Sequence, residues 1–214
     1  MKKSYRFIFI LITVSVGLFS CAQAPTPEVN YYLLNTPEQN ISANTHAETI
    51  DEHSAITLVN VVLPQYLKQS SIVMLMNENQ LHYARYHLWG ESLTSAIAKI
   101  MNQSLMNTAL VNKALSQQLL PQNAKQQVLH LVVEIDHFYP TDQARVILSG
   151  RYWLTNKNTK VKNSKQAFDF AFKQTLTADG YGQAVKQMHV LVKQLTENII
   201  QQAKVFSKKT IKDK

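Results

Sequence analysis

Two carboxylates, Glu134 and Asp136, are the residues of this sequence best placed for acid–base chemistry. On a strand, side chains two positions apart project from the same face, within reach of one reaction centre, as a glycosidase pair requires. A solvated outer strand face produces the same pattern. We favour the solvated face, because the sequence offers few groups that could join the pair in a reaction.

Motifs for metal binding or nucleophilic catalysis are absent from the sequence. The histidines show no H-E-x-x-H or comparable ligand spacing, and Cys21 has no second cysteine to join it. There is no G-x-S-x-G motif, and the glycines are too scattered for a phosphate-binding loop. We therefore predict no catalytic residue, no metal and no cofactor, and expect a protein that is not an enzyme.

The lone cysteine, Cys21, has a different chemistry. Lys2, Lys3 and Arg6 precede an uncharged apolar run over residues 7–19, which is the plan of a bacterial export signal. The segment Leu18-Phe19-Ser20-Cys21 that follows resembles a lipobox, although Phe19 is bulkier than the usual residue at its position. The resemblance implies a diacylglycerol on the thiol, cleavage before Cys21 and an N-acyl chain on the new amino terminus.

The alternative for Cys21 is a plain secreted protein with an accidental free thiol, which an oxidising periplasm disfavours. Several acyl chains make a stable anchor, since burial contributes roughly 0.8 kcal/mol per methylene. Ala22 stands where an aspartate would retain a lipoprotein at the inner membrane of enteric bacteria. We therefore expect lipid anchoring at the outer membrane, with the domain facing the periplasm.

The remaining chain has the length and composition of one domain. We divide it into a signal peptide (1–20), an acylated tether (21–29), a single α+β domain (30–206) and a basic tail (207–214). The leader supplies three of the cations in the formal net charge of +8. An exported, mildly basic protein meets anionic lipids and lipopolysaccharide phosphates, so we expect no nucleic-acid partner.

Hydrophobic periodicity predicts strands, a helix, further strands and a second helix. β-Branched, aromatic or alternating runs indicate strands at 31–34, 56–63, 72–76, 81–86, 128–138, 145–154 and 168–172. Apolar stripes at spacings of three and four indicate helices over about 93–108 and 185–206. Residues 35–54 read as a loop, and 111–121 are ambiguous. We expect an α+β fold: an antiparallel or mixed sheet packed on two long helices.

Two short motifs stand at the ends of predicted strands. The first is V-V-L-P-Q-Y-L, which contains Pro64, Tyr66 and Leu67, and the second is L-W-G-E-S-L, which contains Trp89, Glu91 and Leu93. With the lipobox, Tyr31-Tyr32-Leu33-Leu34 and the later D-G-Y-G segment, the chain resembles the PqiC (YmbA) family of ABC-type transport auxiliary lipoproteins. Relatives usually show Arg-Trp-Ala-Glu-Pro-Leu at the second motif, so Leu88, Gly90 and Ser92 depart from the pattern.

The resemblance implies a binding role in the bacterial envelope. It implies an outer-membrane lipoprotein that works with a periplasm-spanning MCE-domain protein and an inner-membrane component, in a system that moves lipids or maintains envelope integrity. The six motif residues are then family or partner-contact positions, and the protein would dock the distal end of its partner as a ring of identical copies. For Trp89, a core position packing the helix against the sheet is the interpretation we favour.

Two other functions stay open from the sequence. An outer-membrane lipoprotein could instead assist assembly of a β-barrel or of lipopolysaccharide. A tethered periplasmic enzyme would require a deep pocket with convergent titratable groups.

Overall fold

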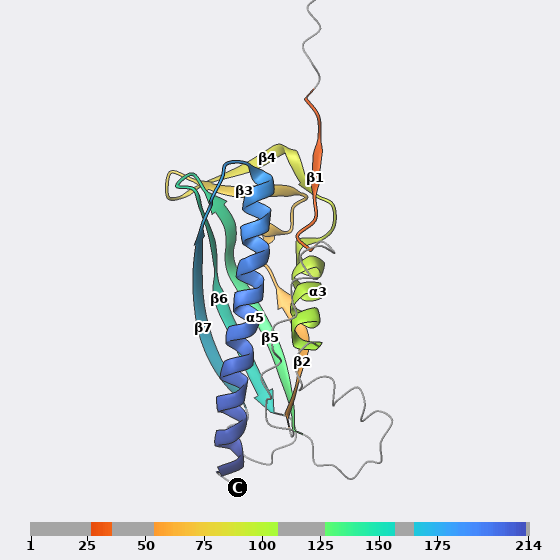
Figure 1. The fold of residues 1–214 in the computed structure, drawn as a ribbon, viewed down its shortest axis with the longest axis vertical. Helices are drawn as coiled ribbons and strands as arrows, with labels where there is room; N and C mark the ends of the chain where they lie inside the picture. The colour runs from red at the N-terminus through yellow and green to blue at the C-terminus, as the bar shows by residue number, and fades with distance from the viewer. Residues whose placement is uncertain (1–26, 36–53, 107–126, 157–164, 213–214) are drawn as a thin grey trace, which may run out of the picture.

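The computed structural model describes residues 27–35, 54–106, 127–156 and 165–212. Cys21, the signal peptide and the ambiguous segment 111–121 lie outside this described part, as does most of the predicted loop at 35–54. The elements follow the predicted order of strands, helix, strands and helix (Figure 1). They are β1 (Asn30–Tyr32), β2 (Ser54–Val62), η2 (Gln65–Leu67), β3 (Ser71–Met76), β4 (Gln80–Trp89), α3 (Leu93–Met106), β5 (Gln127–Thr141), β6 (Arg145–Asn156), β7 (Lys165–Thr175) and α5 (Tyr181–Lys212).

The strands form one mixed sheet in the order β1-β4-β3-β5-β6-β7, with β2 pairing with β5 beside this path. The predicted hairpin of β3 with β4 and the predicted meander of β5, β6 and β7 are both antiparallel, as expected. Three parallel pairs join the first strands to later ones: β1 lies along β4, β2 lies along β5, and β3 meets β5 at Leu75 and Thr141. The sheet is therefore mixed: neighbouring strands of the hairpin and the meander are antiparallel, whereas strands far apart in the sequence pair in parallel.

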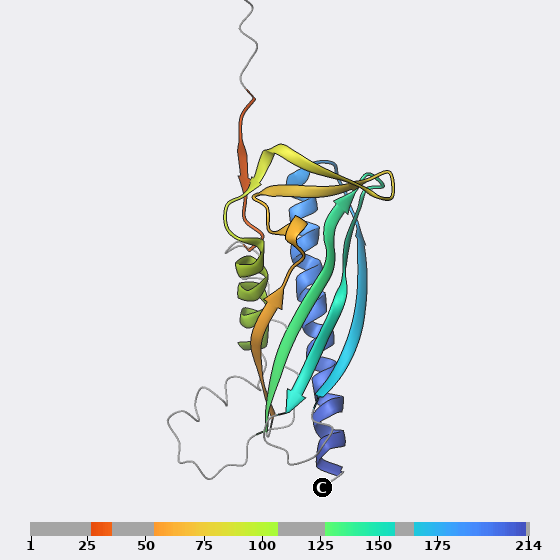
Figure 2. The ribbon, with the colours of Figure 1, turned by 180° about the vertical axis from the view of Figure 1, so that it is seen from behind.

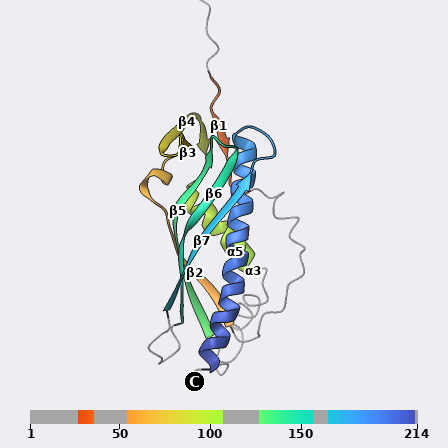
Figure 3. The same cartoon turned by 90° about the vertical axis from the view of Figure 1, so that its left-hand side faces the viewer.

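Both helices cover the same face of the sheet, so the molecule has two layers (Figure 3). Helix α5 packs on β5, β6 and β7, and α3 packs on β2 and on α5. The apolar stripes predicted for the two helices are buried, and position 108 lies outside the described residues. Helix α5 continues through Lys212, beyond the start of the predicted tail.

The core lies between this helical layer and the inner face of the meander. Alternate side chains of β5 and β6 point into it, and Tyr152 is fully buried there. Its ring stacks on Phe168 with a centroid separation of 5.1 Å, and its hydroxyl donates to Asn198 Oδ1 of α5 at 3.2 Å. Burial raises the pKa of Tyr152 to about 12. This hydrogen bond supplies the partner that a buried hydroxyl needs.

Candidate partner-binding surface

The first motif forms the turn between β2 and β3. Pro64, with a φ of −65° and a ψ of 156°, ends the extended segment, and η2 closes with a 3.1 Å hydrogen bond from Leu67 N to the Pro64 carbonyl. Leu63 and Leu67 are both buried and hold the turn on the core. Tyr66, between them, is only half-buried. The motif therefore fixes one aromatic side chain outside the core.

The strand beneath this turn is interrupted by a β-bulge. The pairing of β5 with β6 shifts between Ile135, opposite Gly150, and His137, opposite Ser149. Both Ile135 and Phe138 are buried, because the extra residue, Asp136, moves the inward-facing positions by one. A Cβ on Gly150 would stand 2.1 Å from the Glu134 carbonyl oxygen, so a glycine is required at this close approach.

The bulge positions a polar group for Tyr66. The hydroxyl of Tyr66 donates to the carbonyl oxygen of Asp136 at 2.6 Å and lies 3.4 Å from His137 Nδ1. The hydroxyl of Tyr139 is 3.2 Å from the same nitrogen, and its ring centroid is 6.3 Å from that of Tyr66. The electrostatic interaction with Tyr83 of β4 is the smallest of the causes that raise the pKa of Tyr66.

We call Tyr66, Tyr83, His137 and Tyr139 the tyrosine patch; Tyr139 is only 6% exposed and packs against the Tyr66 ring, so the surface of the patch comes from the other three residues. Burial is the largest cause that raises the pKa of Tyr66, followed by Tyr139 and Asp136. The hydroxyl therefore stays protonated at neutral pH and remains a hydrogen-bond donor. Tyr83 is 43% exposed and belongs to a strand that crosses one end of the molecule. The patch combines aromatic surface with hydroxyl and imidazole groups, a composition common in protein interfaces.

The second motif forms the junction from β4 to α3, and its aromatic residue is part of the core. Trp89 is 8% exposed, pairs with Tyr32 of β1, and donates its backbone N–H to the Ser70 carbonyl at 2.7 Å. Leu93 is buried at the first residue of α3. Trp89 thus has the core position that we favoured, and its side chain is not available at the surface.

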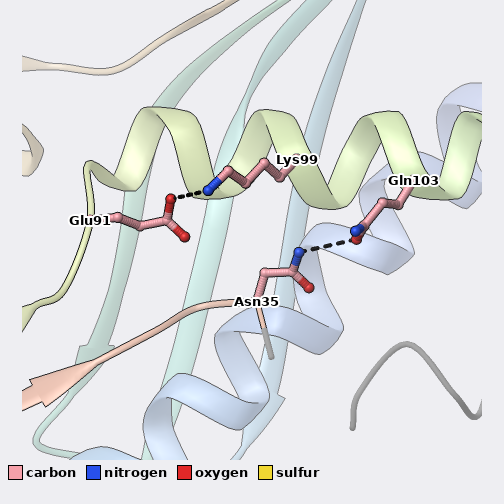
Figure 4. Close-up of polar contacts among 4 residues, drawn as sticks. All are labelled: Asn35, Glu91, Lys99 and Gln103. Carbon is pink, nitrogen blue, oxygen red and sulfur yellow. Dashed lines mark hydrogen bonds and ion pairs between the residues drawn. The ribbon is translucent and has the colours of Figure 1, made fainter. Parts of the chain in front are cut away.

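Glu91 of the same motif forms a salt bridge with a lysine of α3 (Figure 4). Its carboxylate accepts a 2.5 Å hydrogen bond from Lys99 Nζ, although it precedes the first helical turn. Nearby, Asn35 Nδ2 donates to Gln103 Oε1 at 3.1 Å, which ties the segment after β1 to the same helix. The Ser70–Trp89 hydrogen bond links the second motif to the segment just after the first, and of the two aromatic motif residues only Tyr66 reaches the surface.

Figure 2 shows the face of the sheet that the helices leave open. The carboxylate pair lies on this side of β5, because its residues alternate with the buried Val133 and Ile135. Glu134 and Asp136 are both exposed, and Glu134 pairs in register with Arg151. Arg151 Nε donates to Asp169 Oδ1 at 2.6 Å, which raises the pKa of the guanidinium. Charges of both signs therefore alternate across three strands, as on a solvated sheet face.

One pocket of about 240 Å³ opens at the end of the molecule where α5 begins. This is smaller than the roughly 300–1,000 Å³ of ordinary small-molecule sites, so it could not enclose a two-chain lipid. Two carboxylates, Asp142 and Asp179, contribute to its lining. The other lining residues are mostly apolar and include Met74, Pro140, Leu176, Tyr181 and Ala184.

Residues 32–200 match the family model described as the ABC-type transport auxiliary lipoprotein component. The chain belongs to this family. It is the PqiC (YmbA) family that the two motifs resemble, and its members are auxiliary components of ABC-type transport systems. No curated protein matches the sequence.

Solved structures share the fold of this family member. A crystal structure of an uncharacterized protein aligns with a TM-score of 0.57 and 18% identity, over 83% of this chain and 99% of its own. A Xanthomonas campestris protein of family model DUF330 aligns with a TM-score of 0.53 and 7% identity, over 75% of this chain and 90% of its own. At these identities the likeness concerns the arrangement of sheet and helices.

The described residues add two observations on membranes and metals. No helix among them is long and apolar enough to cross a bilayer. Across the same ranges, no three His, Cys, Asp or Glu side chains gather in a way that could hold a metal ion. The lipidation site predicted at Cys21 lies outside the described residues and stays a prediction.

The sequence identified Tyr66 but not its neighbours in the tyrosine patch. His137 and Tyr139 were not identified, because the bulge at Asp136 changes which residues of β5 lie against Tyr66. Gly150, a glycine inside a strand pattern, was the available signal, since such glycines often mark a bulge or a close backbone approach.

Proposed function

We propose that this protein is an outer-membrane lipoprotein that docks a periplasm-spanning MCE-domain protein in an intermembrane lipid transport or envelope-integrity system. Its role is to bind and position, without catalysis. Lipid on Cys21 anchors it, an inner-membrane component completes the system, and several copies form a ring. Family membership over residues 32–200 is the observation that carries this proposal.

The tyrosine patch is the proposed contact with the MCE-domain partner. Tyr66 is held by its hydrogen bond to the bulge carbonyl, so little side-chain entropy remains to be lost on binding. Tyrosines fixed in this way are frequent energetic centres of interfaces. Anchoring confines this protein to the membrane at which the distal end of the partner would arrive, so even a small contact would produce stable docking.

The open face of the sheet supports binding over catalysis. The carboxylates Glu134 and Asp136 are exposed to solvent beside Arg151, whereas an acid–base pair works in a site that excludes water. The pocket at the start of α5 is too small to enclose a phospholipid. These features favour a subunit that positions another protein.

Membrane fractionation tests the anchor. The unaltered protein should sediment with the outer membrane and carry acyl chains on Cys21, as measured by mass spectrometry. Cys21→Ser should leave the circular dichroism spectrum of the domain unchanged but release it into the periplasm and abolish function. Full function from the released domain would contradict the proposed role of the anchor.

Photo-crosslinking in living cells tests the docking surface. A photo-reactive phenylalanine analogue in place of Tyr83 should capture an MCE-domain protein, identified by mass spectrometry. The matched control carries it in place of Val205, which is 64% exposed on α5. Capture of a β-barrel assembly protein at position 83, or equal MCE capture at both positions, would contradict the proposal.

A further inference from the structure

Strand β1 and the residues on either side of it expose a row of large apolar side chains next to the proposed lipid anchor. Val29 is 43% exposed, Tyr31 69% and Leu33 47%. They alternate along the chain, so they share the face of the extended segment that points away from the core. We call these three residues the β1 row. Exposed apolar residues grouped in this way commonly mark an interaction surface.

The opposite face of β1 holds the row in a fixed geometry. The hydroxyl of Tyr32 lies 2.8 Å from His87 Nδ1, and the His87 ring stacks on Tyr181 with a centroid separation of 4.0 Å. Leu34 is fully buried, and its carbonyl accepts a 2.9 Å hydrogen bond from His189 Nδ1. The segment that contains β1 is thus tied to both β4 and α5, and this ordered segment presents the exposed row.

The position of β1 in the molecule and in the chain indicates what covers the row. β1 is the first strand of the sheet order and lies at the end of the molecule opposite the C-terminal end of α5 (Figures 1 and 2). Val29 follows Cys21 by eight positions, which an extended chain spans with at most about 28 Å. Glu28 is the only charged residue between Cys21 and Asn35.

We infer that the β1 row lies in the headgroup region of the membrane that holds the anchor. This inference rests on the acylation of Cys21 in the proposed function. Tyr31 has the amphipathic ring favoured at bilayer interfaces, and its aliphatic neighbours enter the outer edge of the acyl chains. Because the anchor already confines the domain, the three side chains need only weak affinity to orient it. The C-terminal end of α5 then points away from the membrane.

Depth-dependent quenching on the full mature lipoprotein tests this orientation. The protein is reconstituted into vesicles of phosphatidylethanolamine and phosphatidylglycerol, and an environment-sensitive fluorophore is attached to Tyr31→Cys. Acylation blocks the Cys21 thiol, so labelling is specific. The matched control is Val205→Cys, which is as accessible but lies towards the other end of α5. Both positions are exposed, and circular dichroism should show both proteins folded.

We expect the probe at position 31 to shift to the blue and to lose most of its emission when lipids with shallow nitroxide groups are included. The probe at position 205 should keep its emission. Equal emission from both probes in vesicle-bound protein would overturn the inference and leave the anchor intact. A blue shift at position 31 without quenching would also overturn it, because protein then covers the row. Protein that lacks acyl chains and fails to float with vesicles would instead contradict the proposed function.

Discussion

The two family motifs use their aromatic residues in opposite ways. Trp89 is 8% exposed where β4 meets α3, while Tyr66 stands half-buried on a turn. Buried leucines lie next to both aromatic residues in the sequence, so the apolar pattern alone does not show which of the two is buried. The difference lies in what the neighbouring strand presents: beneath Tyr66, the bulge at Asp136 exposes a carbonyl that a hydroxyl can reach.

The two motifs therefore have different roles: the motif with Trp89 stabilises the fold, and the motif with Tyr66 presents a surface. The Trp89 junction joins β1, β4 and the start of α3 through backbone hydrogen bonds and apolar packing. The Tyr66 turn places hydroxyl and ring groups at the surface. Substitutions at the junction should therefore reduce stability, and substitutions at the turn should reduce partner binding.

The largest effect should come from Trp89→Ala. Removing a buried indole leaves a cavity, and we expect the free energy of unfolding to fall by about 3–5 kcal/mol. Urea denaturation followed by far-UV circular dichroism measures it without relying on tryptophan fluorescence. Trp153→Ala, at a half-buried position on the open face, is the control and should cost much less. Equal losses for both variants would show that Trp89 is not a core residue of this kind.

Gly150→Ala should cause the second-largest loss of stability, because the added methyl group disrupts the bulge that supports Tyr66. The new Cβ would meet the Glu134 carbonyl oxygen at 2.1 Å, so backbone must move, at a cost of about 2–3 kcal/mol. Gly182→Ala is the matched control: no atom lies within 4 Å of its added Cβ. Because Gly182 is in α5, alanine there should stabilise the protein slightly. A neutral Gly150→Ala in urea denaturation would contradict the required close approach.

The sequence predicts the individual strands and helices of this fold, but not all of the strand pairs. The strands of the meander, both helical stripes and the hairpin follow from local periodicity, and the structure confirms them. The parallel pairs of β1 with β4 and β2 with β5 join segments distant in the sequence. Hydrophobic periodicity indicates where a strand forms but not which strand it pairs with, so these pairs could not be predicted.

The candidate surface was predictable only at Tyr66. The contacts of its neighbours His137 and Tyr139 with it depend on the bulge, which changes which residues of β5 lie against Tyr66. The size and polarity of the two side chains favour burial of Trp89 over Tyr66. The burial that each one reaches depends on its neighbours in the folded structure. In a sequence, a core aromatic and an interface aromatic differ little, because both pack against apolar side chains.

A smaller, pH-dependent effect should come from His189, which ties α5 to the end of the β1 segment. Burial lowers its pKa, Lys193 lowers it further, and the hydrogen bond to Leu34 offsets part of this. The unfolded chain, with a histidine pKa near 6.5, then binds a proton that the folded chain does not. The free energy of unfolding should therefore fall as the pH drops below about 6.5, by at most about 1.4 kcal/mol per pH unit.

Urea denaturation at pH 5.0–7.5 measures this dependence. His189→Gln keeps an N–H donor but does not titrate, so its stability should vary less with pH over this range. His82→Gln, at an exposed position, is the control and should retain the dependence. An unchanged slope in His189→Gln would assign the pH dependence to other groups.

The smallest effect on stability and the most informative one on function should come from Tyr66→Phe. It removes only the hydroxyl that donates to the Asp136 carbonyl, which should cost about 1 kcal/mol or less, since the turn is open to water on one side. The ring is no longer fixed, so crosslinking of the MCE-domain partner from position 83 should fall, and Tyr66→Ala should abolish it. Wild-type crosslinking by a folded Tyr66→Ala protein would show that the turn, like the Trp89 junction, only stabilises the fold.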